Sequence, residues 1–312
     1  MTLRRALDCA SLCFIAATAL AVSTCAALAD KTIVDGSGRE VKVTDVSRIL
    51  SVGGDVTEIL YALKANDKII GIDATSQYPA DALRTKPNVG YLRALSSEGV
   101  LATNPTLIIA SRDAGPPPVV AVLKSSSIPY VQVPDDKTPE GVAAKIRFIA
   151  SVIGAEAAGE ALAKDVERDF ALLAEQRAKI TKPKRALFVL SVQNGKATVA
   201  GTETSADAIF KLAGVMNATS GTHGYKPLAD EAGVELAPDA VVTMPHGRSG
   251  PPSDPISTVT ALASSPALKD NNVIVMDSLY LLGFGPRCAS AARELMATLY
   301  PELAMKRASA AE

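Results

Sequence analysis

The amino-acid sequence predicts an α/β protein built from two lobes. Three observations point to this class. Short apolar segments alternate with helix-like segments in two separate stretches, which is typical of strand–helix–strand units with parallel sheets. Between these stretches, residues 138–182 are rich in Ala, Leu, Glu, Lys and Arg and show no strand signal. The second stretch also repeats a residue pattern of the first.

The N-terminal residues are typical of a secretory signal peptide. A pair of arginines precedes an uncharged run from Leu12 to Leu28, and a small-x-small cleavage pattern ends at Ala29. We therefore expect residues 1–29 to be removed and the protein to be exported. A membrane anchor is the alternative, but the run is short for a span and is diluted by Ala, Ser and Thr. A lipoprotein modified at Cys25 is less favoured, because Thr precedes this cysteine instead of Gly or Ala.

The cysteine count and the charge limit which disulfides and which binding partners the mature chain can have. Cleavage removes three of the four cysteines and leaves Cys288, which cannot form an internal disulfide. The full chain has 32 basic and 33 acidic residues, so we expect neither a nucleic acid nor an anionic membrane as partner. No second apolar stretch is long enough to span a bilayer, so the mature chain is not expected to be membrane-embedded.

The first lobe is assigned to residues 30–136. A hairpin is expected over residues 33–43, where apolar and polar residues alternate around a Gly-Ser-Gly turn. Strands are expected over 48–54, 68–74, 105–111 and 128–134, and helices over 55–67, 96–103 and the segment after the proline run 116–118.

A backbone helix, residues 137–182, is expected to join the lobes, with Gly154 either kinking one long helix or separating two. The second lobe is assigned to residues 183–312. A turn is expected at Asn194-Gly195. Strands are expected over 185–192, 197–201, 240–244 and 272–277, and a helix over 205–214.

The two lobes share a local pattern. "GYLRALSSEGVLATNP" begins at Gly90 and "GYKPLADEAGVELAP" begins at Gly224. Each contains Gly-Tyr, then a glutamate (Glu98 and Glu231), then a proline seven residues after that glutamate, then a strand. Such an internal repeat predicts two similar domains that face each other across a cleft. Coincidence between two ordinary helix–loop–strand units is the alternative.

Enzymatic motifs are absent. The sequence has no GxGxxG after a strand, no P-loop, no GxSxG and no HExxH. The two histidines, His223 and His246, cannot complete a zinc site without carboxylates. A binding protein that holds a ligand between its lobes is therefore favoured over an enzyme. An exported enzyme that uses one of the histidines is the alternative.

The segments "VGYLRALSSEGVLATNPTLIIAS", "GYKPLADEA" and "LYLLGFGPR" resemble the haem-binding members of one class of periplasmic substrate-binding proteins. This helical-backbone class feeds ABC importers of haem, cobalamin and ferric siderophores. The resemblance covers essentially the whole mature chain. It implies two Rossmann-like lobes joined by a long backbone helix, a ligand cleft between the lobes and a periplasmic location. It further implies delivery of haem to a two-fold ABC permease with its ATPase, downstream of an outer-membrane haem receptor. A cobalamin or ferric-siderophore binder is the alternative.

The resemblance implies that Tyr91 ligates the haem iron. A phenol, with a pKa of about 10, is a poor ligand until it is deprotonated, but a ferric ion and a nearby arginine both favour the anion. Residues two apart in extended backbone face the same side, so we expect Arg93 to bond the Tyr91 oxygen. Such an anionic oxygen prefers Fe(III). An ordinary packed aromatic is the alternative.

Further residues are expected near the haem propionates or the walls of the cleft. The resemblance places an arginine in the loop after strand 240–244, where Arg248 is the nearest match, and His246 lies in the same loop. Tyr225 and Lys226 are expected to line the wall opposite the iron ligand. Arg112 follows a strand of the first lobe and suits a propionate. Solvated loop side chains are the alternative for His246 and Arg112.

Glu98 and Glu231 suggest a docking role. The resemblance implies that a glutamate on each lobe pairs with arginines of the permease, and matched positions suit a two-fold receptor. Ordinary solvated helix residues are the alternative. Leu281 to Arg287, "LLGFGPR", is expected to form a buried turn at the base of the last helix, without contact to the ligand.

Overall fold

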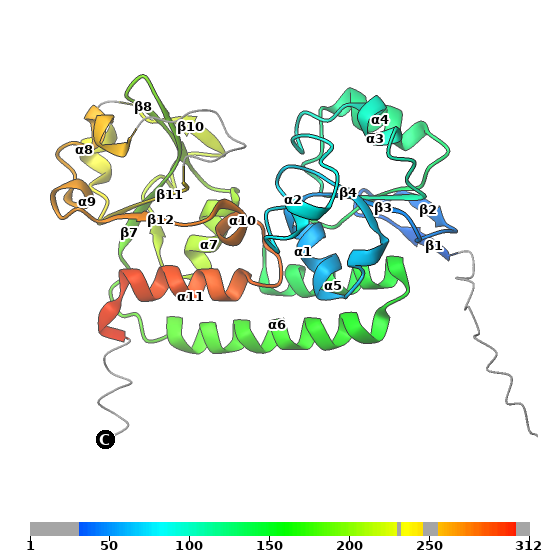
Figure 1. Ribbon diagram of the computed structural model, residues 1–312. Coiled ribbons are helices and arrows are strands. Elements are labelled where there is room, and N and C mark those ends of the chain that lie inside the picture. Colours follow the sequence, from blue (N-terminus) through cyan, green and yellow to red (C-terminus); the bar gives the residue numbers. More distant parts are fainter. Residues whose placement is uncertain (1–30, 230–231, 246–254, 304–312) are drawn as a thin grey trace, which may run out of the picture.

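A computed structural model describes residues 31–229, 232–245 and 255–303. The predicted signal peptide, residues 1–29, lies outside these ranges. Two lobes stand side by side on a layer of long helices (Figure 1). Within the described ranges, no helix has the length and apolar character needed to cross a membrane.

The N-terminal lobe is built on a parallel sheet with the strand order β4-β3-β5-β6. Every residue of β3 and β5 is buried, as expected for a parallel sheet that is covered on both faces. The predicted hairpin is present as an antiparallel pair, β1 (Lys31–Val34) and β2 (Glu40–Val43). The remaining elements are β3 (Ile49–Val52), α1 (Gly54–Ala62), η1 (Asn66–Lys68), β4 (Ile69–Ile72), α2 (Ala82–Thr85), α3 (Ser97–Leu101), β5 (Leu107–Ala110), α4 (Pro117–Ser125) and β6 (Tyr130–Gln132).

The expected backbone helix consists of two helices, α5 (Pro139–Ile153) and α6 (Glu156–Arg177). Thr138 caps the start of α5 by accepting a hydrogen bond from the backbone of Gly141. Gly154 ends α5 because it adopts a left-handed conformation, φ 71°, which glycine reaches without steric cost. The two helices pack against each other, and α6 extends beneath both lobes (Figure 1).

The C-terminal lobe has a mixed sheet in the order β10-β8-β7-β11-β12. The turn at Asn194-Gly195 joins β7 and β8 as an antiparallel hairpin, whereas β11 is parallel to both β7 and β12. The elements are β7 (Arg185–Gln193), β8 (Lys196–Ala200), α7 (Ser205–Leu212), β9 (Met216–Asn217), β10 (Tyr225–Pro227), α8 (Ala232–Leu236), β11 (Ala240–Thr243), η2 (Ile256–Thr258), η3 (Thr260–Leu262), α9 (Pro266–Lys269), β12 (Val273–Val275), α10 (Ser278–Leu282) and α11 (Cys288–Leu299).

One hydrophobic cluster runs through both lobes and the helical layer. It includes Ile59 of α1, Phe170 of α6, Phe210 of α7 and Leu295 of α11, all of them buried. The helix α11 packs on α6 beside the C-terminal lobe (Figure 1). Because the apolar sides of these helices are shared, the two lobes are tied through a common core.

Candidate functional site

Tyr91 lies in the loop between β4 and α3. Its carbonyl accepts a hydrogen bond from the backbone of Ala94 at 2.8 Å, so the chain turns here instead of running extended. Gly90 has φ 102°, a conformation that side-chain-bearing residues rarely adopt, and its carbonyl is bonded by Ala74 N at 2.8 Å. The tyrosine thus stands on a tight turn, with 37% of its surface exposed.

Arg93 contacts the phenol of Tyr91. Its Nη1 donates to Tyr91 Oη at 2.9 Å. The expected contact is therefore present, although the extended backbone from which we predicted it is wrong. The turn brings the two side chains together instead.

Asp113, which sequence reasoning missed, is the second partner of Arg93. Its Oδ2 accepts from Arg93 Nη2 in an ion pair. Burial lowers the pKa of Arg93, but the hydrogen bond with Tyr91 and the charge of Asp113 outweigh burial and raise that pKa above its ordinary value. An acidic residue just beyond the carboxyl end of a parallel strand is the sequence signal that would have indicated Asp113.

Tyr225 brings the C-terminal lobe to this cluster. Burial raises the pKa of its phenol; the charge of Arg93 opposes this rise and the charge of Asp113 adds to it. The Tyr225 phenol therefore lies within electrostatic range of both groups, although it belongs to the opposite lobe. It stands on the edge strand β10, with 39% of its surface exposed. Tyr91, Arg93, Asp113 and Tyr225 are called the tyrosine cluster below.

Lys226 is the neighbour of Tyr225 on β10. Successive side chains of a strand point to opposite faces. In agreement, Lys226 lines a separate cavity of about 290 Å³ with Val199, Leu228 and Leu236. Tyr225 and Lys226 therefore point to different faces of β10, whereas we expected both of them to line the wall opposite Tyr91.

The other predicted site residues fall into two groups. Arg112 and Glu98 are exposed, and neither side chain has an ion pair or hydrogen bond with the residues that the structure describes. Glu98 lies in the first turn of α3, which Ser96 caps by accepting from Gly99 N at 3.3 Å. Glu231, His246 and Arg248 lie outside the described residues.

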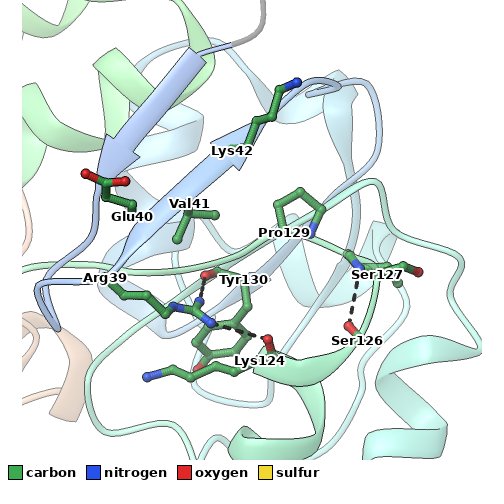
Figure 2. A pocket seen from close by; sticks show the side chains of 10 residues that line it. Arg39, Glu40, Val41, Lys42, Lys124, Ser126, Ser127, Pro129 and Tyr130 are labelled. Carbon is green, nitrogen blue, oxygen red and sulfur yellow. Dashed lines mark hydrogen bonds between the residues drawn. The ribbon is translucent and has the colours of Figure 1, made fainter.

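A second cavity, of about 200 Å³, lies at the edge of the N-terminal lobe between β2, α4 and β6 (Figure 2). It is smaller than the roughly 300 Å³ that ligand pockets usually reach. The guanidinium of Arg39 points toward α4 and β6, where it donates hydrogen bonds to the backbone carbonyls of Lys124 and Tyr130. This arginine thereby holds the lobe edge together, and no member of the tyrosine cluster lines the cavity.

Across residues 31–229, 232–245 and 255–303, no group of three or more His, Cys, Asp or Glu side chains could hold a metal ion. His223 is 70% exposed and lies 3.7 Å from Glu203. Among the described residues, no hydrogen bond or ion pair joins His223 to a member of the tyrosine cluster.

Periplasmic binding proteins match this chain over residues 49–280, which include strands of both lobes. The chain belongs to this periplasmic binding protein family.

Three known proteins are similar to this chain over most of its length. It is similar in structure to the periplasmic heme-binding protein RhuT from Roseiflexus sp. RS-1 in apo form, with a TM-score of 0.77 and 34% identity over 83% of this chain and 100% of that chain. It is 26% identical to an uncharacterized ABC transporter substrate-binding lipoprotein, YvrC of Bacillus subtilis, over 87% of this chain and 86% of that protein. It is 25% identical to the vitamin B12-binding protein of Vibrio parahaemolyticus, over 80% and 88%.

The two-lobed α/β fold predicted from the sequence is confirmed by this family and by the structural match. The family and its structural neighbours are substrate-binding transport proteins, which agrees with the prediction of a binding protein over an enzyme. Of the three named relatives, one is a heme-binding protein and one is a vitamin B12-binding protein.

Proposed function

We propose that this periplasmic binding protein captures haem between its lobes through Tyr91 and delivers it to an ABC importer in the inner membrane. The observation that carries the proposal is the pairing of Tyr91 Oη with Arg93 Nη1 at 2.9 Å on a tyrosine that is 37% exposed. A buried, packed aromatic would have neither this exposure nor a cation directed at its oxygen.

The chemistry of the pair suits ferric haem. A tyrosine becomes a strong ligand when its proton leaves, and a positive charge close to the oxygen favours that anion. Arg93 supplies such a charge. Its two terminal nitrogens allow it to donate to Tyr91 and to Asp113 at the same time. The anionic oxygen then prefers Fe(III), so oxidised haem is expected to bind more tightly than reduced haem.

The remainder of the haem needs an apolar wall and cations for its propionates. Tyr225 offers an aromatic surface from the opposite lobe. Arg112 follows β5 close to Asp113, and its exposed guanidinium, without a partner among the described residues, suits a propionate. Arg248 and His246 are proposed for the facing loop of the C-terminal lobe.

Docking to the importer is proposed for Glu98 and Glu231. Glu98 supports this role because it is exposed and unpaired among the described residues, so a permease arginine reaches it without breaking an internal contact. A two-fold permease would engage one glutamate on each lobe.

A corrinoid is the second candidate ligand, because this chain is 25% identical to a vitamin B12-binding protein over most of both lengths. Haem is favoured since the structural similarity to a heme-binding protein is accompanied by 34% identity.

The test is the visible spectrum of the purified mature protein with ferric haem. Wild type should give a high-spin ferric spectrum with a tyrosinate charge-transfer band, and Tyr91→Phe should lose that band. Tyr78→Phe is the matched control, because Tyr78 is also an exposed tyrosine with an arginine, Arg287, stacked on its ring at 3.5 Å. An unchanged spectrum for Tyr91→Phe would refute the ligand assignment. Binding of cyanocobalamin without binding of haem would favour the second candidate.

A further inference from the structure

Arg93 is held from two sides. One guanidinium nitrogen donates to Tyr91 Oη at 2.9 Å, and the other pairs with Asp113 Oδ2. The side chains of Arg93 and Asp113 are 53% and 50% exposed. Exposed ion pairs of this kind contribute little to the free energy of unfolding. The effect of Asp113 is therefore expected in the orientation of the guanidinium and not in the stability of the fold.

The meeting of Arg93 and Asp113 is set by the backbone. Leu95 N donates to the carbonyl of Gly115 at 2.9 Å, and Gly115 N donates to the carbonyl of Leu92 at 2.9 Å. These two bonds tie the loop that carries Tyr91 to the loop that follows β5. Leu92 and Leu95 are themselves buried, so the two loops are fixed relative to each other. Asp113 thus faces Arg93 because of the fold and not through a chance contact of flexible surface side chains.

We propose that Asp113 is a positioning residue that holds Arg93 on the oxygen of Tyr91 and so gives the site its preference for a ferric porphyrin over a metal-free one. The proposal rests on the proposed function. An arginine side chain has many rotamers, and it takes up one fixed orientation only where contacts hold it. Without Asp113, the Arg93 guanidinium is free to turn into solvent, and the Tyr91 oxygen then loses its donor.

Charge balance gives Asp113 a second effect on the same site. A ferric porphyrin core carries a net positive charge, which the anionic oxygen of Tyr91 offsets. Arg93 favours the anionic oxygen of Tyr91 through its hydrogen bond, and the carboxylate of Asp113 reduces the repulsion between the Arg93 guanidinium and the cationic core. Arg93 is also occupied on both sides, so the propionates are left to other cations such as Arg112.

The experiment measures the affinity of the mature protein for gallium(III) protoporphyrin IX, a redox-inert ferric analogue, and for metal-free protoporphyrin IX. The proteins are wild type, Tyr91→Phe, Arg93→Ala, Asp113→Ala and the double variant Arg93→Ala/Asp113→Ala. Asp113→Ala should weaken gallium porphyrin binding about tenfold, the usual effect of losing a hydrogen bond to a charged group, and should leave metal-free porphyrin binding unchanged. Asp113→Glu should restore part of the loss.

The double variant separates positioning from an independent role. If Asp113 acts through Arg93, adding Asp113→Ala to Arg93→Ala should cost less than about twofold. Asp81→Ala is the control, because Asp81 forms an exposed ion pair with Arg84, outside the tyrosine cluster. Additive losses, or equal losses for both porphyrins, would overturn the positioning role.

Failure of the proposed function gives a different result from failure of this inference. If wild type does not prefer the gallium porphyrin, or if Tyr91→Phe keeps the preference, both the function and the inference fall. If the preference depends on Tyr91 and Arg93 while Asp113→Ala binds as wild type does, the inference alone falls. The tyrosinate charge-transfer band of the ferric haem complex is the second readout, and we expect it to weaken in both Asp113→Ala and Arg93→Ala.

Discussion

Glu58 and Arg287 form a two-armed ion pair that joins the C-terminal segment to the N-terminal lobe. Arg287 Nε and Nη2 each donate to a carboxylate oxygen of Glu58 at 2.9 Å. Glu58 lies on α1 with only 5% of its side chain exposed, and Arg287 directly precedes α11. The Arg287 guanidinium also stacks on the ring of Tyr78 at 3.5 Å. The segment Leu281–Arg287, predicted to be a buried turn, begins in α10 and is only partly buried, with Leu281 and Phe284 facing the core. It also anchors the C-terminal segment to the N-terminal lobe.

Glu58→Gln should lower the free energy of unfolding by about 2 to 3 kcal/mol. The amide keeps the shape of the side chain but leaves Arg287, which is 28% exposed, without a counter-charge. Urea denaturation of the mature protein measures the loss. Glu156→Gln is the control, because Glu156 pairs with Lys31 at the surface, with side-chain exposures of 59% and 36%, and should cost less than about 1 kcal/mol. Equal losses for the two variants would contradict the anchoring role.

The stability of the protein should fall as the pH rises above 10.5. Burial lowers the pKa of Lys145, but the charge and the hydrogen bond of Asp55, 2.6 Å away, outweigh burial and raise it above the ordinary 10.5. A lysine whose folded pKa is raised stabilises the fold fully below its unfolded pKa, and this contribution is lost as the pH rises through the folded pKa.

Asp55→Asn tests the same pair. It leaves the buried ammonium of Lys145 without its partner, so the variant should be less stable than wild type by about 3 kcal/mol at pH 7. The difference between the two proteins should narrow above pH 10.5, as the wild-type contribution is lost. Thermal melting followed from pH 7 to pH 11 measures this, and a constant difference would show that Lys145 is not the group responsible.

Cys288 should be unreactive in the folded protein. Burial raises the pKa of its thiol to about 12, against the opposing charge of Lys145, and the residue is 2% exposed. At pH 8 only about one thiol in ten thousand would be ionised, and the thiolate is the reactive form. A disulfide reagent should label the mature protein slowly when folded, and it should label one thiol per chain in denaturant. Rapid labelling of the folded protein would contradict this burial.

Glu98→Ala combined with Glu231→Ala should leave haem affinity intact and reduce transport. The loss of two interfacial charge pairs should weaken docking to the permease about tenfold or more. Haem-dependent stimulation of the importer ATPase in proteoliposomes measures docking, and a haem titration measures affinity. Glu175→Ala, an exposed glutamate of α6, is the control. Reduced affinity with normal stimulation would argue against docking at these glutamates.

Most strands of both sheets were predictable because their signals are local. The buried strand Leu107–Ala110 is an uninterrupted apolar run, and the hairpin turn at Asn194-Gly195 has the residues that such a turn requires. The short edge strand Tyr225–Pro227 was missed because a proline and exposed side chains weaken its strand signal. Its hydrogen bonds to β8 form only once the C-terminal lobe is folded.

The sequence by itself determined the two α/β series, the helical segment between them and the nearness of Tyr91 to Arg93, since periodicity, turn residues and contacts two residues apart are properties of short stretches. Only the tertiary structure decided which distant groups meet. Asp113 reaches Arg93 from 20 residues away, and Glu58 reaches Arg287 from 229 residues away. The physical reason is that such pairs depend on the order of the strands and the anchoring of the loops. A local pattern can mark Asp113 as the residue that follows a strand, but it does not identify Arg93 as its partner.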